Sequence, residues 1–206
     1  MSRTIDYYFS FSSPWAFIGH DRLAAVARRH GATLAWYPVL LGDLFAQTGG
    51  LPLPRRHPAR QRYRMVELQR WRHRLGLDFN LRPAFWPFDA TLADKVLIAA
   101  LEAGHAVDPF ARRVFAGVWQ RQENLADPDT LRAVLAEVGL PGDLVAQAAG
   151  ENIVGLYARN HDRAIAADVF GSPSYVLEGE VFWGQDRIDL LDEALSEGRA
   201  PFSPDV

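Results

Sequence analysis

Residues 4–16 read T-I-D-Y-Y-F-S-F-S-S-P-W-A, an alternating stretch that runs into two serines and a proline. The odd-numbered side chains from Ile5 to Phe9 are apolar or aromatic and alternate with more polar ones, which is the pattern of a half-buried strand. Pro14 suits the first position of a helix, because the backbone N–H that proline lacks would have no partner there. The stretch therefore predicts a strand that passes into a helix at Ser13.

The segments that follow extend this unit. The predicted helix ends at residues 28–30, R-R-H, whose positive charges suit the negative end of a helix dipole, and Gly31 is the expected stop. Residues 33–39, T-L-A-W-Y-P-V, predict a second strand, and Pro38 places that end at an edge or a bulge. Strand, helix and strand in this order favour a right-handed parallel crossover.

The C-terminal part of the chain returns to strand patterns. Residues 174–177 and 181–183 carry mainly aromatic and aliphatic side chains and flank Glu178-Gly179-Glu180, which predicts a short hairpin. Residues 186–197 then place apolar side chains at helical spacing, which predicts an amphipathic helix. The chain is thus expected to end in a β-β-α unit.

The middle of the chain, from about residue 58 to residue 170, has a helical pattern. Asp108 and Asp127, each followed by proline, are expected N-caps. The element order is therefore β-α-β, a helical block and β-β-α, which indicates an α/β thioredoxin-like fold with a large inserted all-helical domain. We expect residues 1–45 and 168–206 to form the thioredoxin-like domain and residues 46–167 to form the insertion.

The composition excludes several classes of chemistry. The chain has no cysteine, so it forms no disulfide, offers no thiolate to a metal and carries no thiol redox chemistry of its own. The six histidines show no metal-ligand spacing, and no glycine-rich phosphate loop is present, so neither kind of site is expected. The net charge of −3 argues against general binding to nucleic acid or to membranes.

Charge and hydropathy are otherwise uneven along the chain. Nine arginines and only two carboxylates lie between Arg55 and Arg82. A solvated helix face is the simplest interpretation, and a cleft that takes an anionic ligand is another. The N-terminal residues lack the pattern of a signal peptide, and the longest aliphatic run, residues 96–101, is too short to span a bilayer. A cytoplasmic protein is therefore expected.

Ser13 has two interpretations from the residues alone. As a helix N-cap, its hydroxyl accepts from an orphan backbone N–H and contributes roughly 1 kcal/mol. A helix N-terminus also concentrates positive potential, so a serine there can donate a hydrogen bond to a thiolate or an oxyanion. Because the chain has no thiol, a thiol at this place has to come from a ligand.

Three stretches together resemble a known family. They read Y-Y-F-S-F-S-S-P-W-A from residue 7, W-Y-P-V-L-L-G from residue 36 and V-F-G-S-P-S-Y-V-L-E-G-E-V-F-W-G-Q-D-R from residue 169. In this order they are similar to the 2-hydroxychromene-2-carboxylate isomerases, which are relatives of the kappa-class glutathione transferases within the DsbA-like thioredoxin superfamily. The resemblance covers nearly the whole chain and implies a thioredoxin fold with a helical insertion.

The resemblance also implies site residues. In that family the serine before the proline at the helix tip holds the sulfur of glutathione as a thiolate, which implies a catalytic role for Ser13. Pro173 corresponds to the cis-proline of the thioredoxin fold, and the backbone of Ser172 to the groups that pair with the cysteinyl part of glutathione. The two positions after the glycine of W-G-Q-D-R bind the γ-glutamyl end. This role falls to Gln185 and to Asp186, whose carboxylate suits an ammonium group.

Three positions in the middle of the chain depart from the family's pattern. Gly50 stands at the usual place of an asparagine, Arg60 at that of a lysine and Asp89 at that of a second asparagine. Arg60 still offers a guanidinium to a ligand carboxylate, in a bidentate geometry that lysine lacks. The departures fall where the substrate is expected.

The resemblance implies an isomerase that interconverts 2-hydroxychromene-2-carboxylate and trans-o-hydroxybenzylidenepyruvate in aromatic hydrocarbon catabolism, with glutathione as cofactor. A transient glutathione adduct would make the double bond single, so that the bond rotates before the thiolate leaves. Two alternatives stay open: a kappa-like glutathione transferase, which releases the conjugate, and a non-catalytic DsbA-like binding protein. Relatives are usually dimers, so a homodimer is expected, with a small aromatic carboxylate as substrate.

Overall fold

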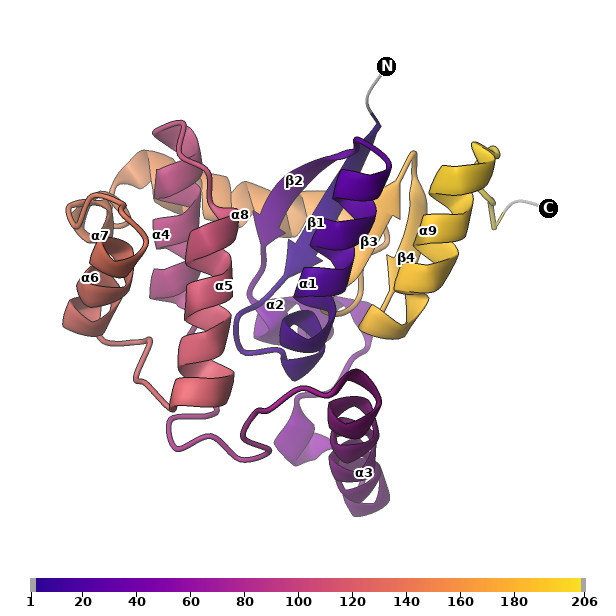
Figure 1. Cartoon of the computed structure of the whole chain (residues 1–206), viewed down its shortest axis with the longest axis horizontal. Coiled ribbons are helices and arrows are strands. Elements are labelled where there is room, and N and C mark those ends of the chain that lie inside the picture. The colour runs from indigo at the N-terminus through magenta and orange to yellow at the C-terminus, as the bar shows by residue number, and fades with distance from the viewer. Residues whose placement is uncertain (1–2, 205–206) are drawn as a thin grey trace. The chain divides into compact units, whose positions relative to one another are not determined.

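The structure, a computed structural model, describes residues 3–204 (Figure 1). The chain divides into two compact units, Met1–Gly50 with Asn160–Val206 and Leu51–Arg159. The first unit contains all the strands of the described residues, and the second contains helices. The domain borders expected from the sequence, after residue 45 and before residue 168, stay a prediction.

A mixed sheet with the strand order β2-β1-β3-β4 forms the centre of the first unit. Its strands are β1 (Thr4–Phe9), β2 (Thr33–Pro38), β3 (Ser174–Leu177) and β4 (Glu180–Trp183). β1 and β2 run parallel, whereas β3 runs antiparallel to both β1 and β4. The parallel crossover, the edge position of Pro38 and the C-terminal hairpin are thereby confirmed.

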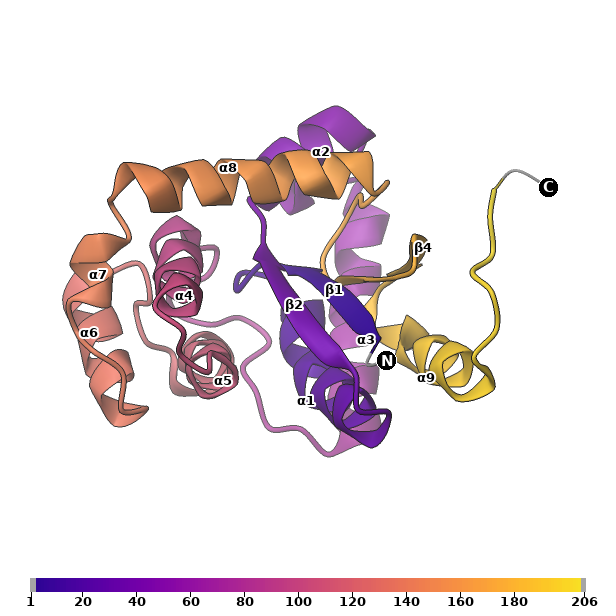
Figure 2. The ribbon, with the colours of Figure 1, turned by 90° about the horizontal axis from the view of Figure 1, so that it is seen from above.

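Helices cover both faces of this sheet (Figure 2). The helices α1 (Pro14–Arg29) and α9 (Ile188–Glu197) lie on one face, while α2 (Leu41–Thr48) and the C-terminal end of α8 (Glu151–Ala166) lie on the other. Successive side chains of a strand point to opposite faces, so Tyr7 and Tyr8 of β1 are both fully buried. The alternating pattern predicted a half-buried strand, whereas β1 is covered on both sides.

The second unit is helical, as expected. Its elements in chain order are η1 (Leu53–Arg55), α3 (Pro58–Leu75), α4 (Thr91–Glu102), α5 (Asp108–Ala116), the π-helical turn η2 (Gly117–Arg121), α6 (Pro128–Glu137), α7 (Leu144–Gln147) and the first part of α8. Asp127 caps α6 by accepting from the backbone N–H of Thr130 at 2.8 Å. The N-cap predicted at Asp108 is wrong. This residue is the first of α5, and its carboxylate accepts instead from Arg112 Nε one turn later, at 2.7 Å.

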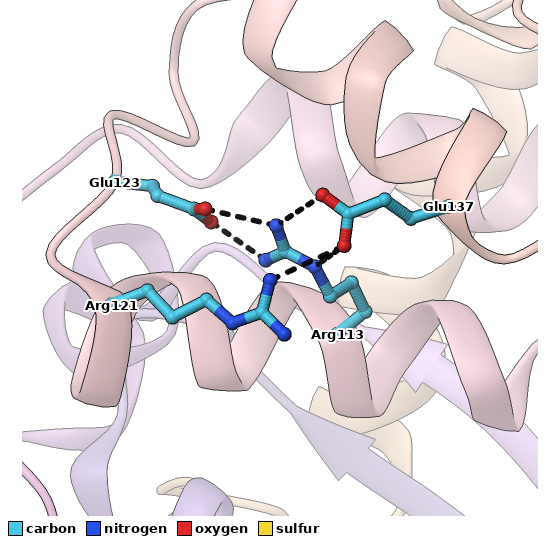
Figure 3. A network of polar contacts seen from close by, with 4 residues as sticks. All are labelled: Arg113, Arg121, Glu123 and Glu137. Atoms are coloured by element: carbon cyan, nitrogen blue, oxygen red, sulfur yellow. Dashed lines mark hydrogen bonds and ion pairs between the residues drawn. The ribbon is translucent and has the colours of Figure 1, made fainter.

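Arg113, on α5, is the centre of an ion-pair network in the second unit (Figure 3). Its guanidinium donates to both carboxylate oxygens of Glu123 and to both of Glu137, over N···O distances of 2.6–2.9 Å. Arg121 adds a bond of 3.2 Å to Glu137. Because only 8% of Arg113 is exposed, the two bidentate carboxylates satisfy a buried charge and tie α5 to α6.

No helix of the described residues is long and apolar enough to cross a membrane. Residues 3–204 contain no group of three or more His, Asp or Glu side chains placed to hold a metal ion.

Candidate functional site

The turn between β1 and α1 places Ser13 at the first turn of α1. The backbone N–H of Ser13 donates to the carbonyl of Ser10 at 3.0 Å, and Pro14 begins the helix. Ser13 Oγ accepts from the backbone N–H of Ala16 at 3.3 Å, so the N-cap interpretation is confirmed. The hydroxyl therefore lies at the positive end of the α1 dipole, where a negative charge is stabilised.

The cis-proline segment meets this helix tip, although it lies 159 residues further along the chain. Ser13 Oγ donates to the backbone carbonyl of Ser172 at 3.0 Å, and the backbone N–H of Ser10 donates to Ser172 Oγ at 3.0 Å. The Ser172–Pro173 peptide bond is cis, as the resemblance implied. The structure thus brings together Ser13, Ser172 and Pro173, three of the residues expected at the site.

Ser12 was not predicted to be a site residue. Its hydroxyl lies 2.9 Å from that of Ser10, and its backbone N–H donates to Ser10 Oγ at 3.4 Å. Ser12 is half-buried, whereas only 4% of Ser13 is exposed. The resemblance selected Ser13 from the Ser-Ser pair before Pro14, and it is the Ser13 hydroxyl that donates to the cis-proline segment.

The loop after β4 is tied to the same segment. The backbone N–H of Gly184 donates to the carbonyl of Pro173 at 2.9 Å, which sets the following residues beside the cis-proline. Asp186 is exposed, and its Oδ2 accepts from Arg187 Nη1 at 2.8 Å. A cationic group of a ligand can reach this exposed carboxylate, where it would compete with Arg187.

Gln185 lies differently from Asp186, since only 2% of it is exposed. Its side-chain Oε1 and its backbone carbonyl both accept from Arg22 Nη1 of α1, at 2.9 and 3.0 Å. Arg22 Nη2 also pairs with Asp189 at 2.7 Å. The Gln185 side chain accordingly anchors the loop to α1. Arg22, which the sequence did not single out, is the residue that makes this anchor.

A glycine in α1 permits this close approach. A Cβ at Gly19 would stand 2.7 Å from Gln185 Cβ and 2.9 Å from the hydroxyl of Tyr175. Such distances are shorter than van der Waals contact, so a larger residue displaces the loop or the helix. Gly19 is therefore part of the local structure that positions Gln185 and Asp186.

Two exposed aromatic side chains flank the cis-proline segment. The rings of Phe170 and Trp183 lie 4.7 Å apart between centroids, with 41% and 52% of these residues exposed. The indole of Trp183 also contacts Gly171, directly before Ser172. This pair presents an apolar surface next to the serine network, which suits an aromatic or aliphatic part of a ligand.

At two of the three positions that depart from the family's pattern, Gly50 and Asp89, the structure shows the local surroundings of the residue that is present. A Cβ at Gly50 would stand 2.5 Å from Cδ1 of Phe45, so an asparagine there requires this ring to move. Asp89 Oδ1 accepts from the backbone N–H of Thr91 at 2.9 Å, next to the start of α4. Hydrogen bonds from Thr91 lower the pKa of Asp89, which keeps this carboxylate ionised.

Arg60 belongs to the second unit, where it lies exposed in the first turn of α3. Within residues 3–204 its guanidinium has no hydrogen-bond or ion-pair partner. The other expected site residues, Ser13, Ser172, Pro173, Gln185 and Asp186, all belong to the first unit.

A cavity of about 530 Å³ lies between β4, α9 and the chain that follows α9. Trp183 and Arg187 contribute to its wall, but the serine network does not. A salt bridge of 2.7 Å between Glu180 and Arg199 crosses its lining. The cavity is thus a neighbour of the candidate site rather than the site itself.

Known proteins are similar to this chain in sequence and in fold. The family model of the DSBA-like thioredoxin domain matches residues 4–196. A 2-hydroxychromene-2-carboxylate isomerase of Sphingobium xenophagum is 27% identical over 201 residues, covering 95% of this chain and 99% of the relative. Glutathione S-transferase kappa 1 of Homo sapiens is 22% identical over 215 residues, covering 96% and 92%.

A solved structure supports the same relationship at the level of the fold. The structure of selenomethionine-labelled 2-hydroxychromene-2-carboxylate isomerase aligns with a TM-score of 0.75 and 23% identity, over 94% of this chain and 95% of that one. The resemblance noted from the sequence motifs is therefore confirmed by relatives that extend over almost the whole chain. The chain belongs to the family of DSBA-like thioredoxin domains.

Proposed function

We propose that this protein is a glutathione-dependent isomerase that interconverts 2-hydroxychromene-2-carboxylate and trans-o-hydroxybenzylidenepyruvate. The observation that carries the proposal is the position of Ser13, a hydroxyl at the N-terminus of α1 beside the cis-proline segment, in a chain without cysteine. The name of the Sphingobium relative supports the reaction, and that of the kappa-class relative supports glutathione.

The residues of the first unit fit glutathione. Glutathione supplies a thiolate that adds reversibly to a conjugated double bond and leaves again, so no glutathione is consumed. Ser13 and the start of α1 favour a thiolate over a thiol, because a hydroxyl donor and the helix dipole both stabilise negative charge. For this role the Ser13 hydroxyl has to turn away from the Ser172 carbonyl, to which it donates in the structure.

The resemblance supplies roles for the remaining site residues, and their contacts in the structure are compatible with those roles. The exposed carboxylate of Asp186 binds the ammonium of the γ-glutamyl group, and Gln185 positions Asp186 through its bond to Arg22. The backbone of Ser172 and the cis Pro173 pair with the cysteinyl part. The resemblance assigns Arg60, whose guanidinium has no carboxylate partner among residues 3–204, to a carboxylate of glutathione or of the substrate.

A spectroscopic assay tests the proposal. The ultraviolet spectrum of 2-hydroxychromene-2-carboxylate is followed with the purified protein, with and without glutathione. Isomerisation is expected only with glutathione, and it is expected to fall about 10²-fold in Ser13→Ala, the loss typical of removing one donor to a developing charge. Ser12→Ala is the matched control, since its hydroxyl contacts Ser10 rather than Ser172. Isomerisation that persists without glutathione, or that falls equally in both variants, contradicts the assignment.

The kappa-class relative favours one second candidate, a glutathione transferase. A transferase releases the conjugate, so it consumes one glutathione per turnover, whereas the isomerase consumes none. Titrating free thiol during the reaction separates the two. A non-catalytic binding protein would show neither reaction. A cytoplasmic location and a homodimer belong to the proposal as well, and light scattering of the purified protein tests the dimer.

A further inference from the structure

The helix α3 carries an unusual density of positive charge. It runs over Pro58–Leu75 with Leu68 as its one buried residue, and it bears six arginines. Arg60 and Arg64 are four residues apart on α3, so their side chains project from the same face of the helix. Arg56 lies just before the helix, and its carbonyl accepts from the side chain of Gln61 at 2.8 Å.

The arginines of this helix differ in whether a carboxylate neutralises them. Arg70 pairs with Glu67 and Arg72 pairs with Asp78, over N···O distances of 2.5 and 2.8 Å. No carboxylate of the described residues lies within ion-pair distance of Arg60 or Arg64.

The Arg64 guanidinium packs against an aromatic side chain. It lies over the indole of Trp86, 4.9 Å from the ring centroid, and Trp86 packs in turn on the fully buried Trp119 at 6.0 Å. Arg64 is half-buried, and its Nη1 also donates to the sulfur of Met65, at 3.8 Å. A charge set against an aromatic wall is pre-organised, so little side-chain freedom is lost when an anion binds.

The three guanidinium groups also influence one another. Burial and the positive charge of Arg56 lower the pKa of Arg64 to about 10. Burial and the charge of Arg60 likewise lower the pKa of Arg56. Like charges brought together in this way destabilise the protein, and a bound anion with two negative charges removes that cost.

We infer that Arg56, Arg60 and Arg64 form a binding site for a small organic dianion, a molecule with two adjacent negative charges beside an apolar body. The planar forks of three arginines match the oxygens of carboxylates and phosphates, and Trp86 provides the apolar neighbour. The inference goes beyond the single carboxylate proposed above for Arg60. It lies entirely within the second unit and does not require that Ser13 acts on a thiol.

Isothermal titration calorimetry on the full chain, without glutathione and at low ionic strength, tests the site. The probes are phthalate as an aromatic dicarboxylate, phenyl phosphate as an aromatic phosphate ester and benzoate as a monoanion. At least one of the two dianions is expected to bind about tenfold more tightly than benzoate, a difference of ~1.4 kcal/mol. The dianion that binds more tightly identifies the preferred chemistry.

Single substitutions in α3 test which arginines bind the dianion. Arg60→Gln and Arg64→Gln are each expected to weaken dianion binding about tenfold or more, the cost of losing one charge-assisted contact. Arg62→Gln is the matched control, because Arg62 lies on α3 but away from the face shared by Arg60 and Arg64. Ser13→Ala is expected to bind like the wild type, which separates this result from the proposed reaction.

Thermal unfolding provides a second, independent readout. The saturating dianion is expected to raise the thermal unfolding midpoint of the wild type more than that of Arg64→Gln. In low salt and without the dianion, the midpoint of Arg64→Gln is expected to exceed that of the wild type. Dianions that bind no better than benzoate overturn the inference. Equal losses in Arg62→Gln and Arg64→Gln do so as well.

Discussion

The hydroxyl of Ser13 donates to the backbone carbonyl of Ser172, the residue that precedes the cis-proline, over 3.0 Å. A serine hydroxyl has one proton, so it cannot donate to this carbonyl and to a ligand sulfur at the same time. The backbone N–H of Ala16 continues to hold Ser13 Oγ at the helix tip if the hydroxyl turns. The O–H group that donates to Ser172 in the structure is thus the one that would donate to a bound thiolate.

The pKa of the glutathione thiol in the complex reports this exchange. In Ser13→Ala the thiolate loses a hydrogen-bond donor, so we expect the pKa of the bound thiol to rise by about one unit, which corresponds to ~1.4 kcal/mol. Thiolate absorbance in the ultraviolet, titrated against pH with glutathione at saturation, measures this pKa.

Ser12→Ala provides the comparison. Because its hydroxyl contacts that of Ser10, we expect the thiol pKa in this variant to stay at the wild-type value. If the thiol pKa rises in Ser12→Ala and not in Ser13→Ala, the hydrogen-bond donor is Ser12, which is the more exposed of the two residues.

The parts of the fold that local chemistry controls could be predicted from the sequence. The passage from β1 to α1 followed from alternation, a serine cap and Pro14, each of which acts over a few residues. The hairpin of β3 and β4 followed in the same way from its turn residues. Asp108 shows the limit of such signals, since an Asp-Pro pair fits both the cap and the first helical position.

The candidate site depended on contacts between distant segments, and there the pattern was not sufficient. The resemblance placed Ser13, Ser172 and Pro173, whereas the residue pattern around Ser12 and Ser13 does not by itself indicate which of them meets Ser172. Likewise Gln185 is polar and follows a glycine, a pattern typical of an exposed loop. It is buried because Arg22, 163 residues earlier, provides its hydrogen bonds.

Gly19→Ala tests the contact between α1 and the loop at Gln185. The added methyl has no room, so we expect a loss of about 1–3 kcal/mol in the free energy of unfolding, measured by chemical denaturation. Because the loop carries Asp186, weaker glutathione binding is expected along with the lower stability.

Gly42→Ala in α2 is the matched control for this change. A Cβ at Gly42 meets no atom within 4 Å, and alanine favours a helix over glycine by about 1 kcal/mol. Its stability is therefore expected to stay the same or to rise. If Gly19→Ala is as stable as the wild type, α1 or the loop at Gln185 shifts at little cost to make room for the methyl group.

The network around Arg113 predicts how the second unit responds to acid. Hydrogen bonds from Arg113 lower the pKa of Glu137 from its usual value of 4.5 to about 2. A pKa that is lower in the folded state means that the ion pair stabilises fully above about pH 4.5 and is lost as the pH falls toward 2. Circular dichroism of thermal unfolding across this range should show the decline.

The variant Arg113→Met removes the partner of both carboxylates. We expect it to be less stable than the wild type at pH 7 and to lose less further stability between pH 4.5 and 2, because the ionised Glu137 then keeps only its bond to Arg121. Parallel acid profiles of the two proteins would contradict this account of the network.

Asp94 predicts that the stability of the protein falls as the pH rises, which is opposite to the effect of Glu137. It is fully buried on α4, its Oδ2 accepts from the hydroxyl of Tyr157 at 2.8 Å, and its Oδ1 has no hydrogen-bond partner in the described part of the chain. Burial raises the pKa of Asp94 well above its usual value, so the folded protein favours the protonated acid. Since the unfolded chain releases this proton near pH 4, the protein loses stability as the pH rises beyond that value.

Asp94→Asn removes the ionisation and keeps an oxygen that can accept from Tyr157. We expect the variant to be more stable than the wild type at pH 8, with the difference shrinking as the pH approaches 4. Tyr157→Phe is the control, because it keeps the ionisable group and leaves Asp94 Oδ2 without its donor, at a cost of about 1–3 kcal/mol. An Asp94→Asn variant that is less stable than the wild type at every pH would mean that the carboxylate is ionised and satisfied in the folded protein.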